Sequence, residues 1–121
     1  MLDIEIKTIT HYKQRYQTVG DYFKDLGTGT ERFRISDMGN KDYEFLVALH
    51  ELIEQYLSEK RGIKEEEIDQ FDINFKGEGE PGDQPNAPYY KEHQFASKIE
   101  KLVAEEMSLN WEDYNNTVEE L

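Results

Sequence analysis

The amino-acid sequence predicts an α+β protein in which a small antiparallel sheet of about three strands precedes three to four helices. Near the N-terminus, apolar and polar residues alternate with a period of two, which is typical of half-buried strands. From residue 43 onward, apolar residues recur with the 3.6-residue period of amphipathic helices. The 121 residues fit one domain, with a β-rich part over residues 1–37 and a helical part over residues 41–121.

Three N-terminal segments carry the strand pattern, at residues 2–9, 19–24 and 31–36. Between the second and third segments lie Gly27 and Gly29, which can adopt the positive φ that a hairpin loop requires. We therefore expect three short strands that pair antiparallel.

The helix predicted over residues 43–60 is the most regular element of the sequence. Polar residues before it offer N-caps, and Gly62 suits the C′ position after it. Shorter helices are predicted over residues 64–75, 88–106 and 111–120. Residues 77–88 are rich in glycine and proline and are predicted to form a loop. A loop of this length in a compact domain is usually functional or mobile.

The composition excludes several functional classes. With 27 acidic and 14 basic residues the net charge is -13, so we expect no nucleic-acid partner, because binding a phosphate backbone needs a basic surface. The absence of cysteine excludes disulfides, thiolate zinc sites and cysteine nucleophiles. No apolar run is long enough for a membrane span, and the acidic N-terminus does not resemble a signal peptide. We expect a soluble cytoplasmic protein without a membrane partner.

The long helix carries the clearest chemical motif, His50-Glu51-Leu52-Ile53-Glu54. His50 and Glu54 are four residues apart and project from one helix face, so both can bind the same ion. The motif resembles the His-Glu-x-x-His motif of zinc hydrolases, with Glu54 in place of the second histidine. That replacement also suits manganese or magnesium. Glu51 is placed where a general base could reach water beside the metal.

A third ligand must come from elsewhere in the chain. The candidates are His93, which could face the first two ligands from an antiparallel helix, Glu92 as the competing oxygen ligand, and Glu100. Glu100 lies on the same helix face as His93, two turns on. His11 is either a fourth ligand or a surface residue.

Two other interpretations of these carboxylates remain open. In an acidic helix, Glu51 and Glu54 could simply be solvated charges. Alternatively, Glu51 and Glu54 together with Glu66 and Asp69 resemble the paired acidic motifs of all-α NTP pyrophosphohydrolases of the MazG type. That resemblance implies magnesium held against a triphosphate. It covers only about twenty residues, and that family is wholly helical, whereas this chain opens with strands.

Four segments together resemble a family of uncharacterised small proteins from phages and bacteria. They are YQTVGDY at 16–22, ISDMG at 35–39, YEFLVALHELIE at 43–54 and GDxPxAPYxxEHxFA at 82–96. The resemblance implies that the His50 helix and the Glu92-His93 segment belong to one recurring unit. It also implies a bacterial or phage-infected host cell as the setting, and it implies no particular activity.

The leading functional hypothesis is a metal-dependent hydrolase that acts on a small-molecule or peptide substrate. A divalent ion, zinc in the first instance, would be held by His50, Glu54 and His93 or Glu92, with Glu51 as general base. The alternative is a non-catalytic acidic phage protein, such as an anti-defence factor or nucleic-acid mimic, that binds a basic host protein. A purely structural metal between two helices is a third interpretation.

Overall fold

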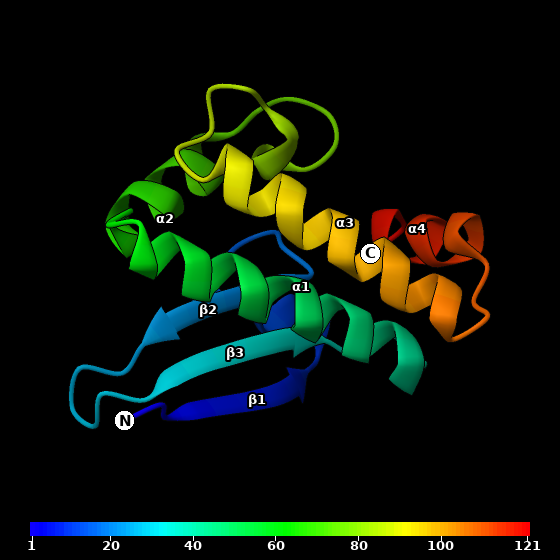
Figure 1. The fold of residues 1–121 in the computed structure, drawn as a ribbon, viewed down its shortest axis with the longest axis horizontal. Coiled ribbons are helices and arrows are strands. Elements are labelled where there is room, and N and C mark those ends of the chain that lie inside the picture. The colour runs from blue at the N-terminus through cyan, green and yellow to red at the C-terminus, as the bar shows by residue number, and fades with distance from the viewer.

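The computed structural model describes residues 1–121 and confirms the α+β fold: a three-stranded sheet is followed by four α-helices (Figure 1). The strands are β1 (Ile4–Ile9), β2 (Gly20–Lys24) and β3 (Glu31–Ser36). The helices are α1 (Lys41–Lys60), α2 (Glu65–Asn74), α3 (Tyr90–Glu106) and α4 (Trp111–Glu119). Two 3₁₀ turns, η1 (His11–Lys13) and η2 (Pro81–Asp83), lie in the connections.

The sheet is mixed, so the prediction of a wholly antiparallel sheet was wrong for β1. The strand order is β1-β3-β2; β2 pairs antiparallel with β3, whereas β1 pairs parallel with β3. The connection over residues 10–19 includes η1 and is long enough to cross the width of one strand, which leaves the central place to β3. The expected hairpin does join β2 to β3, and Gly29 adopts a φ of 79° in it.

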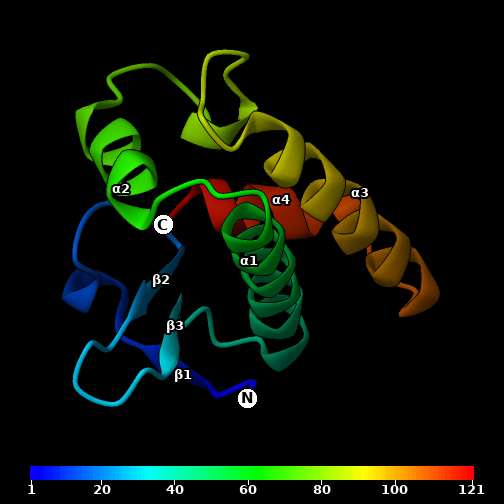
Figure 2. The ribbon, with the colours of Figure 1, turned by 60° about the vertical axis from the view of Figure 1, so that its left-hand side comes forward.

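Helix α1 forms where the pattern predicts it and starts two residues earlier. The side chain of Asn40 caps it by accepting a hydrogen bond from the backbone N–H of Tyr43, and Gly62 follows its end with a φ of 77°. Helix α1 lies across one face of the sheet, and α3 runs beside it (Figures 1 and 2). None of the helices has the length and apolar character needed to cross a membrane.

The apolar core consists of two separate clusters. One is centred on Tyr22 and Phe33 of the sheet and includes Ile68 of α2. The other is centred on Ile35 and Leu46 and includes Tyr114 of α4. A polar network involving α1 and α3 connects to both clusters, because each contributes one tyrosine hydroxyl to it.

Candidate metal centre

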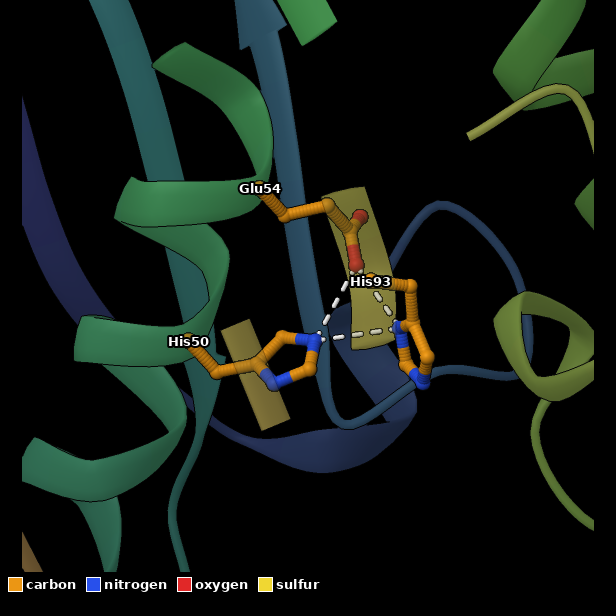
Figure 3. Close-up of side chains that lie close together, drawn as sticks. All are labelled: His50, Glu54 and His93. Carbon is orange, nitrogen blue, oxygen red and sulfur yellow. Dashed lines mark hydrogen bonds and ion pairs between the residues drawn. The ribbon is translucent and has the colours of Figure 1, made fainter. Parts of the chain in front are cut away.

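The structure brings together three of the predicted site residues. His50 and Glu54 project from successive turns of α1, and His93 comes from the first turn of α3 (Figure 3). His50 Nε2 lies 3.0 Å from Glu54 Oε2 and 3.1 Å from His93 Nδ1, and His93 Nδ1 lies 2.8 Å from Glu54 Oε2. All three residues are buried, with exposed fractions of 4–6%. One nitrogen from each imidazole and one carboxylate oxygen therefore meet in a compact triangle.

The size of this triangle suits a metal ion. Ions bound to nitrogen and oxygen at about 2.0–2.2 Å hold neighbouring ligand atoms roughly 3.0–3.4 Å apart. The observed separations of 2.8–3.1 Å need only a small expansion to reach that range. His50, Glu54 and His93 would therefore hold a divalent ion through these three atoms, and the ion would supply Lewis acidity there.

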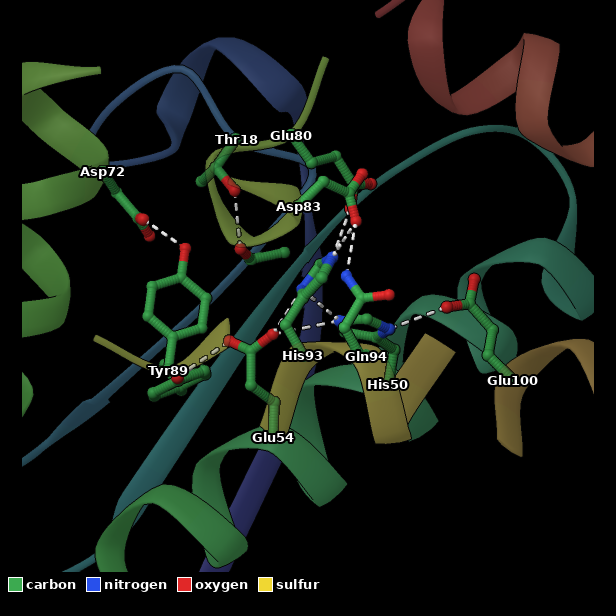
Figure 4. A network of polar contacts seen from close by, with 12 residues as sticks. Thr18, His50, Glu54, Asp72, Glu80, Asp83, Tyr89, His93, Gln94 and Glu100 are labelled. Atoms are coloured by element: carbon green, nitrogen blue, oxygen red, sulfur yellow. Dashed lines mark hydrogen bonds and ion pairs between the residues drawn. The ribbon is translucent and has the colours of Figure 1, made fainter. Parts of the chain in front are cut away.

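A second set of contacts supports the same interpretation, since the other nitrogen of each histidine faces a carboxylate (Figure 4). His50 Nδ1 lies 2.7 Å from Glu100 Oε1. His93 Nε2 lies 3.1 Å from Asp83 Oδ1 and 3.1 Å from Glu80 Oε2. With an ion bound, these outer carboxylates would hold the ring protons on the two outer nitrogens, and each neutral ring would turn a lone pair toward the ion. Three electron-rich atoms in contact require a cation, either protons or a metal ion.

Two tyrosines complete this arrangement. The hydroxyl of Tyr22 donates a hydrogen bond to Glu54 Oε1 at 2.9 Å, which leaves Oε2 to face the histidines. The hydroxyl of Tyr114 donates to Glu100, the carboxylate that holds His50. Each apolar cluster thus contributes one tyrosine whose hydroxyl helps to orient the side chains of the site. Hydrogen-bonding partners behind the ligands are typical of metal sites.

The loop predicted as functional supports His93 directly. Glu80 and Asp83 lie in this loop. Together with His93 they form a second group of three residues whose side chains could hold a metal ion. Both carboxylates are about half exposed, and their contacts to His93 Nε2 match those of groups that fix a ligand's tautomer. Gly82 lies flat against the imidazole of His93, where a Cβ atom would be 2.5 Å from the ring. Only glycine allows this close contact.

The charges of this cluster are strongly coupled. Burial by itself raises the pKa of Glu54, but hydrogen bonds from His50 and His93 outweigh it and lower the pKa to about 2. Burial opposes the charged form of His93, yet its contacts with Glu54 and Glu80 raise its pKa to about 10. Burial likewise opposes the charged form of His50, whose pKa Glu100 and Glu54 raise well above the usual value. Without an ion, protons therefore occupy the cluster, and a metal must displace them.

Glu51 lies on the sheet side of the same helix turn. Its carboxylate packs against Gly20 of β2, where a Cβ atom would lie 2.6 Å from Glu51 Cγ. Burial and the nearby Glu54 raise the pKa of Glu51 well above its usual value. His50, Glu51, Glu54 and His93 all line one cavity of about 750 Å³. Glu51 thus shares with the triad a space large enough for a small ligand.

The other candidates from the sequence lie outside the triad. Glu92 turns toward Arg61 and forms a 2.8 Å ion pair with it. His11 faces Ser36 Oγ at 2.8 Å. Glu66 lines a different cavity from Glu51, and Asp69 binds Arg15, so the four carboxylates of the pyrophosphohydrolase pattern do not form one group.

Sequence reasoning missed four residues that support the triad: Tyr22, Glu80, Asp83 and Tyr114. The position of Asp83 in a loop that precedes His93 closely was a usable signal, because nearby carboxylates often support a ligand histidine. The residues around Tyr22 and Tyr114 in the sequence did not indicate a role at the site, because each tyrosine reaches it from a segment distant along the chain.

No protein-family profile matches the chain, and no curated protein or solved structure is significantly similar to it. The resemblance to small phage and bacterial proteins therefore stays a prediction. The case for a function rests on the geometry of the site.

Proposed function

We propose that this protein is a metal-dependent hydrolase whose ion is held by His50, Glu54 and His93. The observation that carries the proposal is the pairing of each histidine with two kinds of partner. One ring nitrogen faces the shared carboxylate Glu54, and the other is held by an outer carboxylate. The cavity of about 750 Å³ beside the triad gives a substrate access to it.

Zinc is the ion that we propose. Two imidazole nitrogens with one carboxylate oxygen form a donor set found in catalytic zinc sites, where a fourth position stays open. Manganese and magnesium prefer sites that are richer in oxygen ligands. When bound, the ion would supply Lewis acidity, which polarises a substrate carbonyl or phosphoryl group and acidifies water.

Glu51 is the residue that we propose as general base. It follows His50 directly in α1 and lines the same cavity, so its carboxylate can approach a water molecule beside the ion. The charge of a bound ion would favour the ionised form of Glu51, and in that form a pKa raised above that of an exposed glutamate makes it the stronger base. The contact with Gly20 restricts the positions that its side chain can take. Glu51 would accept the proton of the attacking water and return it to the leaving group.

The first test is elemental analysis of purified, untagged protein by mass spectrometry. We expect near-stoichiometric zinc in the unchanged protein, and loss of it in His50→Ala and in His93→Ala. The matched control is His11→Ala, which removes the third histidine of the chain and should keep the metal. Zinc retained by His50→Ala at unchanged affinity would contradict the ligand assignment.

The second test separates catalysis from metal binding. Glu51→Gln should keep the metal but lose at least 100-fold in turnover on any substrate found in an amide, peptide and phosphoester panel. If the metal binds and Glu51→Gln has unchanged turnover, the assigned base is wrong. Bound metal without any turnover would favour a structural ion between α1 and α3. Protein that takes up no zinc, manganese or magnesium would instead favour the acidic interaction protein.

A further inference from the structure

We infer that the cavity beside the metal centre accepts a cationic substrate, an amide or peptide that carries an ammonium or guanidinium group close to the bond that is cleaved. This inference rests on the proposed function and selects one substrate class from those considered above. It follows from the charges and the tyrosine hydroxyls that line the cavity.

The walls of the cavity are strongly acidic. They carry ten Asp and Glu side chains and neither a lysine nor an arginine. A bound divalent ion, together with Arg15, which pairs with Asp21 and Asp69 of the wall, compensates only part of that charge. The interior of a cleft concentrates the field of its wall charges, because the protein around it has a low dielectric constant. A positively charged ligand is therefore attracted, and an anionic one is repelled.

The nearest arginine is already engaged and offers nothing to an anion. Arg15 Nε lies 2.7 Å from Asp21 Oδ2, and Arg15 Nη2 lies 3.2 Å from Asp69 Oδ1. Phosphoester hydrolases normally place arginine or lysine against the phosphoryl oxygens. This cavity provides no such group apart from the proposed ion, which argues against phosphoester substrates.

Asp72 is the carboxylate best placed to receive the cationic group. It comes from α2, on a different wall from the α1 ligands, and its two oxygens accept hydrogen bonds from Tyr16 and Tyr89. Figure 4 shows the bond from Tyr89. Those bonds fix the carboxylate and leave each oxygen a lone pair for another donor. Tyr16 and Tyr89 also line the cavity, so a cation beside Asp72 would meet their phenolic oxygens as well as a negative charge.

The test uses three six-carbon hydroxamates that share a zinc-binding head and differ in the charge at the tail. They are 6-aminohexanohydroxamate, hexanohydroxamate and the monohydroxamate of adipic acid. Calorimetric titration of the zinc-loaded protein at low salt should give the tightest binding to the amine. We expect an advantage of at least 10-fold over the neutral probe, and the carboxylate probe should bind more weakly than both.

Variants locate the preference within the cavity. Asp72→Asn should lower the ratio of amine to neutral affinity at least fivefold and leave the neutral affinity unchanged. Glu78→Gln removes another wall charge from the loop, away from the core, and should lower the ratio by a smaller factor. The matched control, Asp42→Asn, changes an exposed residue outside the cavity and should leave the ratio unchanged.

The outcomes distinguish this inference from the proposed function. Equal binding of all three hydroxamates would leave the metal centre intact and overturn the cationic substrate. Stronger binding of the carboxylate probe would overturn it as well. Protein that binds zinc and none of the probes, or that binds no zinc, would overturn both.

Discussion

Two buried glutamates, Glu54 and Glu31, lie on either side of α1, and the pKa values of their carboxyl groups shift in opposite directions. Glu54 projects from α1 into the candidate metal centre, and Glu31 of β3 accepts a hydrogen bond from Gln55, the next residue of α1. Their exposed fractions are 4% and 8%. Yet the pKa of Glu54 is lowered to about 2, whereas that of Glu31 is raised to about 7.

The difference lies in the partners of the two carboxylates. Glu54 receives two histidines and a tyrosine hydroxyl. Glu31 receives one amide hydrogen bond from Gln55 at 2.8 Å, and its Oε2 atom is buried without a donor. Burial and the nearby Glu65 raise the pKa of Glu31. Burial alone thus favours the neutral acid, and only a prepared set of donors keeps a buried carboxylate charged and ready for a cation.

The largest effect should come from removing the charge of Glu54. Glu54→Gln should weaken zinc binding at least 1000-fold, because an amide oxygen is a much poorer ligand than a carboxylate. Without metal, a carboxyl with a lowered pKa stabilises the fold above pH 4.5 and loses that contribution as the pH falls toward about 2. Urea unfolding of metal-free protein from pH 2 to 7 should therefore show a smaller pH dependence in the variant. If the stability of the variant fell between pH 4.5 and pH 2 as steeply as that of the unchanged protein, this account of Glu54 would be wrong.

Removing the charge of Glu100, the carboxylate that faces His50 Nδ1, should have a smaller effect on zinc affinity. Glu100→Gln leaves all three ligand atoms in place but weakens the support of His50 Nδ1, so zinc affinity should fall about 10- to 100-fold. Competition with a fluorescent zinc chelator measures this change. The control is Glu106→Gln, an exposed residue at the end of α3. Equal affinities for both variants would show that Glu100 does not support the site.

Neutralising Glu31 should raise the free energy of unfolding instead of lowering it. A buried acid with a raised pKa costs stability as the pH rises from 4.5 through about 7, because the unfolded chain releases its proton first. Glu31→Gln should therefore stabilise the protein by about 2 kcal/mol at pH 8 and have little effect at pH 4. Thermal unfolding at the two pH values tests this, and destabilisation at pH 8 would refute it.

The smallest effect should come from the tyrosine hydroxyl on Glu54. Tyr22→Phe removes one donor and keeps the ring that packs on Phe33, so the unfolding free energy should fall by about 1 kcal/mol. Zinc affinity should fall less than in Glu100→Gln, because Oε2 keeps both of its histidine contacts. Parallel unfolding and zinc titrations of the two variants would rank the outer partners.

The sequence allowed the local features to be predicted. The four-residue spacing of His50 and Glu54 requires a shared helix face, and the end of α1 at Gly62 follows from the conformational freedom of glycine. The scarcity of histidine made His93 one candidate for the third ligand, beside Glu92 and Glu100. For α1, short-range geometry was sufficient.

Features that depend on long-range packing were not accessible in the same way. His93 and Glu92 are adjacent, and which of them faces His50 depends on the rotation of α3 against α1. That rotation is set by packing along the whole helix pair. The parallel pairing of β1 likewise depends on how the chain crosses the sheet, and the alternation of its residues is the same in either direction.

The contact between Gly82 and the imidazole of His93 makes the backbone itself a wall of the candidate metal centre. A single methyl group at this position would push on a ligand without changing the chemical identity of any ligand. Gly82 could therefore be used to tilt one imidazole and so alter which ions the site prefers, because metals differ in the geometry they demand as well as in the donor atoms they accept. Metal selectivity here would then be adjustable from a residue that has no side chain.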